Sequence, residues 1–417
     1  MSSELHLYNT LTRRKERFAP REEGKTVKMF TCGPSIYAWP HIGNYRTFLF
    51  EDILQRYLTY LGYTVQRVIN FTDVEDKAIS QAVKSGVSLD ELTKPVARRF
   101  KADCRLLDIA LPETIPRSST CVEQAVYLIE KLLEKGVAYR HGRDIFYDPL
   151  KFRGFGKLFG LDMRRWPKKK VRFRKDTYPG KRWNRGDFIL WKGRREEDGS
   201  VYWKTPLGEG RPAWNIQDPA MISRHMGYTT DIWCGGVDNL YRHHDYNIAV
   251  LEAVSGQTLS RFWLHGEHVL AGKKKMSKST GNIVYVQDLL DTGFSPHHIR
   301  FFLIYGHFQE QIDINEDRLH MARGKVDTLR DMTHQLENGQ AAGGDAAPGA
   351  EDRIRQMTRA FEGRMNDNLD VKNAFDAVYD IASTLLKMKN KGGLTPEEGR
   401  HAARELRRID RVWRVLG

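Results

Sequence analysis

The stretch Pro40-His41-Ile42-Gly43-Asn44 stands between a strand-like and a helix-like segment, and this placement decides the fold. Residues 27–32 alternate in polarity and are rich in β-forming types, whereas 46–61 carry large apolar side chains at helical spacing before Gly62. A second buried strand is predicted at 65–71. Strand, helix and strand in this order predict a βαβ unit, whose ligands bind at the carboxyl ends of its strands.

The α/β pattern returns in the second half of the chain. Residues 230–233 and 262–270 are strand-like, and residues 246–253 between them are helix-like. From residue 296 onward the pattern is helical, apart from an interruption rich in Gly, Ala, Pro and Asp. We therefore predict an α/β domain in two halves (1–135 and 205–295), an inserted basic segment (136–204), and a helical bundle (296–417) with a linker at 338–350.

The composition is that of a folded protein with more than one domain. The chain has 417 residues, of which 40% are apolar and 11% aromatic, and this length exceeds what one hydrophobic core usually supports. No run of about 18 apolar residues is present, and the polar start does not resemble a signal peptide. We expect a soluble cytoplasmic protein with no membrane partner.

Positive charge is concentrated in one part of the inserted segment. The formal net charge is +14, and 164–185 contains eleven Lys or Arg residues against one acid, Asp176. A local patch of this kind favours phosphate or nucleic acid as a ligand. The alternative is a solvated loop that binds nothing.

A second motif, Lys275-Met276-Ser277-Lys278-Ser279, follows far downstream of the first. Lysines beside small residues are common on solvated loops, and a His-x-Gly turn is common by itself. The order of the two motifs is therefore more informative than either motif alone.

Taken together, these motifs resemble the HIGH and KMSKS signatures of class I aminoacyl-tRNA synthetases. Further blocks, in the same order, make the sequence similar to the cysteinyl-tRNA synthetase family from its start to Gly417. These blocks are Leu7-Tyr8-Asn9-Thr10-Leu11-Thr12-Arg13, Thr31-Cys32-Gly33-Pro34, Asn70-Phe71-Thr72-Asp73-Val74-Glu75-Asp76-Lys77, Gly186-Asp187-Phe188-Ile189-Leu190-Trp191-Lys192, Gly208-Glu209-Gly210-Arg211-Pro212 and Arg242-His243-His244.

The resemblance implies a Rossmann-like catalytic domain and a ligase that uses ATP and Mg²⁺. An amino-acid carboxylate would attack the α-phosphorus of ATP, and the aminoacyl group would then pass to an acceptor. Catalysis of this type depends on positioning and charge stabilisation. The implied catalytic residues are His41, Asn44, Lys275 and Lys278. The implied ATP-binding residues are Gly43, Gly235, Gly236, Asp238, Ser277 and Ser279.

Asn44 replaces the second histidine of the family motif, and an amide can still donate a hydrogen bond but carries no charge. We therefore expect reduced rather than abolished activity. For Asp238, the alternative to a ribose contact is a helix N-cap.

The amino-acid pocket departs from the family. Family members hold zinc with two Cys, one His and one Glu, and the zinc binds the substrate thiolate. Cys32 and His243 match two of these ligands, whereas Asp218 stands in place of the second Cys and Asn247 in place of the Glu. The implied amino-acid-binding residues are Cys32, Gly33, Thr72, Trp214, Asp218, His243 and Asn247.

Two interpretations of the metal remain open. Cys32, Asp218 and His243 with a water could form a weaker, harder Zn²⁺ site. Alternatively the metal has been lost, which we favour because Asn215 and Gln217 also replace family residues in the same block. The scattered cysteines Cys32, Cys104, Cys121 and Cys234 form no CxxC pair and predict buried thiols, although Cys234 is also a candidate relocated ligand.

The acceptor is also left open. Family members that charge tRNA continue past a Val-Leu-Gly like Val415-Leu416-Gly417 into an anticodon-reading domain, and this sequence ends there. A relative that joins cysteine to an amino sugar also lacks that domain. We predict activation of an amino acid other than cysteine and its transfer to a tRNA 3′ end or a small amine. The alternatives are a divergent cysteine–tRNA ligase and a catalytically idle paralogue that binds RNA or a protein partner.

Overall fold

The computed structural model describes residues 4–164, 187–276, 280–338 and 349–417. Residues 165–186 of the inserted segment, the residues Ser277, Lys278 and Ser279, and most of the linker lie outside these ranges. No helix in the described ranges is long and apolar enough to cross a membrane.

A four-stranded parallel sheet lies at the centre of the molecule, with strand order β11-β10-β3-β4. Its strands are β3 (Thr26–Thr31), β4 (Thr64–Ile69), β10 (Thr230–Gly236) and β11 (Ser260–Gly266). The helices that connect or flank them are α1 (Ile42–Tyr60), α2 (Asp76–Ser85), α3 (Leu89–Leu106), α4 (Val122–Glu134), α5 (Trp214–His225) and α6 (Asp245–Ser255). The predicted βαβ unit is confirmed, and β3 and β10 meet where the two halves of the sheet join.

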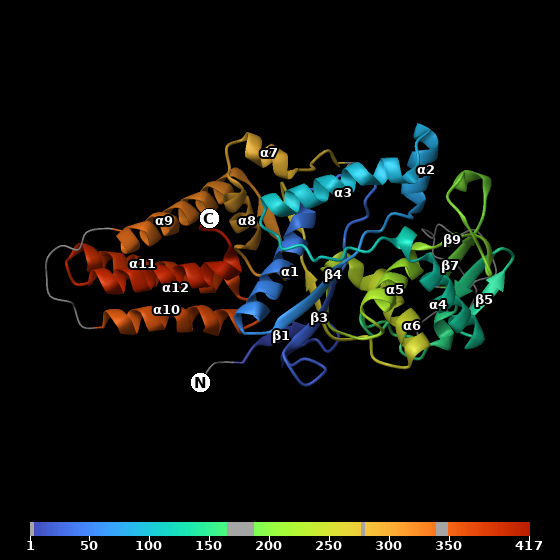
Figure 1. Cartoon of the computed structure of the whole chain (residues 1–417), viewed down its shortest axis with the longest axis horizontal. Coiled ribbons are helices and arrows are strands. Elements are labelled where there is room, and N and C mark those ends of the chain that lie inside the picture. Colours follow the sequence, from blue (N-terminus) through green and yellow to red (C-terminus); the bar gives the residue numbers. More distant parts are fainter. Residues whose placement is uncertain (1–3, 165–186, 277–279, 339–348) are drawn as a thin grey trace.

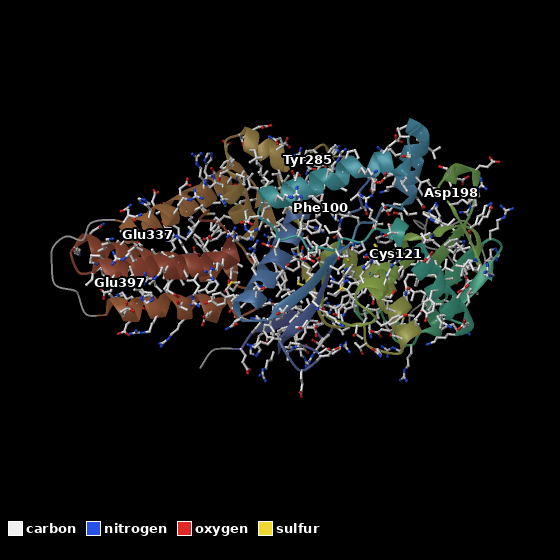
Figure 2. All side chains as sticks on the ribbon, in the orientation of Figure 1. Phe100, Cys121, Asp198, Tyr285, Glu337 and Glu397 are labelled. Atoms are coloured by element: carbon white, nitrogen blue, oxygen red, sulfur yellow. The ribbon has the colours of Figure 1, made fainter. Side chains whose placement is uncertain are left out.

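The strands of this sheet are buried on both faces, as covered parallel sheets require. Successive side chains of a strand point to opposite faces. Met29 and Ile232 therefore pack with α1 in one core, whereas Phe30 and Trp233 pack with α4, α5 and α6 in another. Phe100 of α3 extends the first core, because its ring centroid lies 5.0 Å from that of Phe48 on α1 (Figure 2).

A five-stranded antiparallel sheet, with strand order β5-β6-β7-β9-β8, is formed by the inserted segment together with residues just beyond its predicted end at 204. Its strands are β5 (Ala138–His141), β6 (Asp144–Tyr147), β7 (Phe188–Gly193), β8 (Trp203–Thr205) and β9 (Gly208–Pro212). The sequence predicted only an insertion here, because strands this short show little alternation. Close strand approach demands glycine at Gly210, where a Cβ would lie 2.2 Å from the Lys192 carbonyl oxygen.

The chain ends in a helical bundle, at the opposite end of the molecule from the antiparallel sheet (Figure 1). Its helices are α8 (Pro296–Ile304), α9 (Glu316–Asn338), α10 (Ala350–Met365), α11 (Val371–Asn390) and α12 (Pro396–Trp413). Arg300 joins the bundle to the parallel-sheet domain, because its buried guanidinium donates to Asp52 of α1 at 2.6 Å and to the Trp413 carbonyl at 2.6 Å. The smaller elements are β1 (His6–Asn9), β2 (Arg14–Arg17), β12 (Val269–Ala271), β13 (Lys274–Lys275), β14 (Ile312–Ile314) and α7 (Val286–Asp291).

Candidate active site

A cavity of about 520 Å³ opens at the carboxyl ends of β3 and β10, beside the start of α1. This is the switch point of the parallel sheet, where α/β proteins bind their ligands. Among the residues that line the cavity are the predicted site residues Cys32, Gly33, His41, Asn44, Gly236 and Asp238.

His41 caps the first turn of α1 and faces this cavity. Its Nδ1 accepts from the Gly43 backbone N–H at 3.1 Å, and the Asn44 carboxamide oxygen accepts from the His41 backbone N–H at 2.9 Å. Burial lowers the pKa of His41. The nearby Asp238 raises this pKa in part, whereas Lys275 and His268 lower it further. The neutral ring then carries its proton on Nε2, so His41 and the Asn44 amide nitrogen can both donate to a ligand in the cavity.

Two glycines, one beside His41 and one at the end of β10, permit close approach of a ligand because they have no side chain. A Cβ at Gly43 would lie 3.0 Å from the His41 ring, and one at Gly236 would lie 2.7 Å from Asp238 Oδ1. Asp238 lies in a short 3₁₀ turn capped by Gly236, so the N-cap interpretation of Asp238 is wrong. Lys275 Nζ lies 3.4 Å from Asp238 Oδ2, and Lys275 therefore reaches across to the other side of the site.

A buried polar cluster lies behind Cys32. Asp218 on α5 accepts from His243 Nε2 at 2.7 Å and from Asn70 Nδ2 at 2.8 Å, and its Oδ2 lies 3.7 Å from Cys32 Sγ. Asn70 also accepts from the Gly33 backbone N–H at 2.8 Å. The predicted residues Cys32, Gly33, Asp218 and His243 thus meet in one place, with Asn70 as a bridge that the sequence-based prediction omitted.

Cys32 also contacts a chain of imidazoles. Its Sγ lies 3.0 Å from His244 Nε2, His244 Nδ1 lies 2.8 Å from His265 Nε2, and His265 Nδ1 lies 2.9 Å from Thr10 Oγ1. Burial lowers the pKa of His265 to about 3 and that of His244 well below its usual range, where His265 and His243 add to the effect. Burial raises the pKa of the Cys32 thiol, with Asp218 and Glu51 adding to the effect. Neutral imidazole rings have one N–H donor and one acceptor nitrogen each, so they can form successive hydrogen bonds along this chain and fix the position of Cys32 Sγ.

The other predicted pocket residues surround this cluster. Trp214 stacks on His243 with ring centroids 4.2 Å apart, and Thr72 Oγ1 accepts from Asn70 Nδ2 at 3.5 Å. Asn247 is fully buried, and neither of its side-chain polar atoms has a hydrogen-bond partner among the described residues. Cys234 is also fully buried and packs in the α1 core, as expected of a structural thiol. Cys121 lies elsewhere, beside α5, with Sγ 4.0 Å from His225 Nε2 (Figure 2).

The geometry agrees with the comparisons with known proteins. A family model described as the tRNA synthetases class I (C) catalytic domain matches residues 18–324. The chain belongs to the cysteinyl-tRNA synthetase family. It is therefore a ligase of the class I aminoacyl-tRNA synthetase kind, a family whose substrates are ATP, an amino acid and tRNA.

Individual relatives support this assignment. The cysteine–tRNA ligase of Chlamydia pneumoniae is 36% identical over 415 residues, which cover 99% of this chain and 86% of the relative. That of Chlamydia trachomatis serovar D is 35% identical over 425 residues, which cover 99% and 88%.

Solved structures share the fold. Mycobacterium tuberculosis methionyl-tRNA synthetase in complex with methionyl-adenylate matches with a TM-score of 0.67 and 14% identity, covering 94% of this chain and 90% of that one. A putative arginyl-tRNA synthetase from Campylobacter jejuni matches with a TM-score of 0.60 and 12% identity, covering 95% and 94%.

The side chains around Cys32 fit a zinc ion by their chemistry. Cys32, His243 and His244 bring ligand atoms within 4.8 Å of one another, and Asp218 lies beside them. Thiolate, imidazole and carboxylate are all zinc ligands, although one thiolate makes a harder site than two. His244 was not among the predicted ligands, because the adjacent His243 matched the family position. The His-His doublet was the only signal in the sequence for its role.

Proposed function

We propose that this chain activates an amino acid other than cysteine as an aminoacyl adenylate and transfers it to the 3′ end of a tRNA. The observation that carries this proposal is the contrast within one site. The residues expected to face the ATP phosphates all still carry hydrogen-bond donors, even at Asn44, which replaces a histidine. The residues that hold zinc in the family are instead altered in their ligand chemistry at Asp218 and Asn247.

Activation requires charge stabilisation at the phosphates of ATP. The Nε2–H of neutral His41 and the amide nitrogen of Asn44 supply hydrogen bonds from the start of α1, where the helix N-terminus also favours an anion. Lys275, and Lys278 from the sequence motif, supply positive charge that offsets the charge developing during attack. Gly43 and Gly236 leave room for the nucleotide, and Asp238 accepts from its ribose. Mg²⁺ accompanies ATP in this reaction.

The altered side chains argue against selection by a zinc–thiolate bond. A soft metal site needs soft ligands, and Asp218 supplies a hard oxygen that Asn70 and His243 already engage. Asn247 is neutral and a poor ligand. Without that bond, the pocket loses the metal–thiolate contact by which the family favours a thiol over a hydroxyl.

A tRNA is the acceptor that family membership supports, since both relatives named above are tRNA ligases. A small amine remains the alternative acceptor of our prediction, and none of the comparisons supports it. Transfer assays with total tRNA and with amino sugars distinguish the two. A cytoplasmic location is likewise proposed from the family.

The second candidate is a divergent cysteine–tRNA ligase, which the convergence of Cys32, His243 and His244 favours. The predicted ligands Cys32, Asp218 and His243, with His244 added by the structure, would hold Zn²⁺ and so supply a soft contact for a substrate thiolate.

Amino-acid-dependent exchange between ATP and pyrophosphate tests the proposal. A panel of amino acids is assayed with the protein as purified, after chelation, and after addition of zinc. We expect exchange with at least one amino acid, little preference for cysteine over serine, and no loss on chelation. Chelation-sensitive exchange with cysteine alone would establish the second candidate, and the absence of exchange with every amino acid would establish an idle paralogue.

A further inference from the structure

Asn247 is the buried side chain with the most conspicuous lack of partners near the site. It is 0% exposed, and both its Oδ1 and its Nδ2 are without a hydrogen-bond partner among the described residues. Folded proteins pair nearly all buried polar atoms, because an unpaired one costs about 1–3 kcal/mol. Neither atom forms a hydrogen bond within the described part of the protein, so both are available to a ligand that reaches them.

The position of Asn247 on α6 identifies which ligand. His243 lies one helical turn before it, and the intervening His244 and Asp245 have helical backbone angles, so the two side chains share one face. That face meets α5, because His243 stacks on Trp214 and donates to Asp218.

The neighbours of Asn247 on α6 point elsewhere. Tyr246 stacks on Phe188 at 4.0 Å, and Asp245 accepts from the backbone of Leu158 at 3.1 Å. Asn247 therefore lies on the same helix face as His243, which contacts the cluster behind Cys32. The resemblance to the family places that cluster at the substrate side chain.

A further buried atom one helical turn before Asn247 has no partner among the described residues. It is His243 Nδ1, which can accept a hydrogen bond because the proton on Nε2 is donated to Asp218. With Asn247 it offers one amide donor and two acceptors.

We propose that Asn247 determines specificity by exchanging hydrogen bonds with the substrate's side chain, which is uncharged and carries a hydroxyl or an amide. Such groups both donate and accept, as the two atoms of the Asn247 amide require. An ammonium group offers Nδ2 no acceptor, and a carboxylate offers Oδ1 no donor while facing Asp218. This inference rests on the proposed function and names its substrate class.

The substitution Asn247→Leu tests the inference, because it keeps the volume and removes both unpaired atoms. We expect the KM for the amino acid in pyrophosphate exchange to rise by about 10²-fold, since a site built to hydrogen-bond a substrate discriminates strongly. The KM for ATP is expected to stay the same. The melting temperature is expected to stay the same or to rise, because two unpaired buried polar atoms are removed.

Asn215→Leu is the matched control. Asn215 is a buried asparagine of the neighbouring helix whose Nδ2 donates to the Ile189 carbonyl at 3.0 Å. Its replacement is expected to lower the melting temperature and to leave the amino-acid preference unchanged.

Three results would overturn the inference while leaving adenylate formation established. These are an unchanged amino-acid KM in Asn247→Leu, a loss of melting temperature in Asn247→Leu as large as in the control, and a preferred amino acid whose side chain has neither hydroxyl nor amide. By contrast, if the unaltered protein exchanged pyrophosphate with no amino acid, the proposed function itself would fail.

Discussion

The two sides of the cleft differ in how their polar atoms are used. On the phosphate side, His41 and Asn44 bond to the backbone of α1 and still present N–H groups to the cavity. On the amino-acid side, Asp218 is engaged by two protein groups, whereas Asn247 has no partner among the described residues.

This difference separates the reaction from its specificity. The α-phosphate and its developing charge are the same for every amino acid, so changes among the groups that stabilise them have to keep a hydrogen-bond donor, as Asn44 does in place of histidine. Under the proposed function, the substrate side chain is bound by the second region. Replacements there would change which amino acid is selected and would leave the chemistry of activation in place.

The largest expected effect comes from the phosphate side. Lys278→Ala removes a positive charge from the nucleotide-closing motif and is expected to lower the rate of pyrophosphate exchange by about 10²-fold or more. The measurement is kcat for exchange with the best amino acid. Lys274→Ala, an exposed lysine of β13 in the same region, is the control and should stay within about threefold. Equal losses in the two variants would show that Lys278 contributes only general positive charge and has no specific role in the motif.

The amino-acid side can be converted toward the family pattern. Asp218→Cys combined with Asn247→Glu supplies the thiolate and carboxylate that zinc sites of the family use. We expect zinc per chain, measured by metal analysis, to rise from well below stoichiometric to about one. The preference for cysteine over serine should increase by about 10-fold or more. If the unaltered protein already held one zinc per chain and strongly preferred cysteine, the amino-acid side would not differ from the family pattern, and the proposed contrast with the phosphate side would be wrong.

The lysine- and arginine-rich stretch 164–185 provides a test outside both regions, and all of it except Arg164 lies outside the described ranges. Its eleven positive side chains are interleaved with Trp166, Phe173, Tyr178 and Trp183, which suits contacts with phosphates and bases. Replacing Lys168, Lys169 and Lys170 by Glu should weaken tRNA binding about 10-fold and flatten its dependence on log salt, by about 0.7–0.9 per lost phosphate contact. Pyrophosphate exchange should be unchanged. Unaltered affinity and slope would assign tRNA binding to another surface and strengthen the case for a small-amine acceptor.

The smallest expected effect concerns pH. Burial lowers the pKa of His41 from its ordinary 6.5, so the ring stays neutral as pH falls through that value. Its neutral form contributes stability that is present above pH 6.5 and is lost as pH falls toward the lower pKa of the folded state. Exchange activity should change less than about twofold between pH 8 and 6.5 and decline only below this range. A decline centred at or above pH 6.5, absent in His41→Asn, would show that the cavity does not lower this pKa.

The sequence by itself determined the family and the reaction class, and it predicted the residues at the start of α1 that line the cavity. This was possible because His41, Gly43 and Asn44 form a short local motif whose chemistry depends on one strand end and one helix start. The βαβ unit was also predictable, because the spacing of its apolar residues is a local pattern that spans only a few tens of residues. The short strands of the inserted sheet were not, because strands of three to six residues show too little alternation.

Only the tertiary structure decided what the amino-acid side contains. Cys32 and Asp218 are 186 positions apart in the sequence, and Cys32 and His244 are 212 apart, so their contacts depend on how α5 and α6 pack against the sheet. The bridge made by Asn70, the chain from His244 to His265, and the missing partners of Asn247 are likewise consequences of packing. A side chain's hydrogen-bond partners are set by the elements around it, and residue type alone cannot give them.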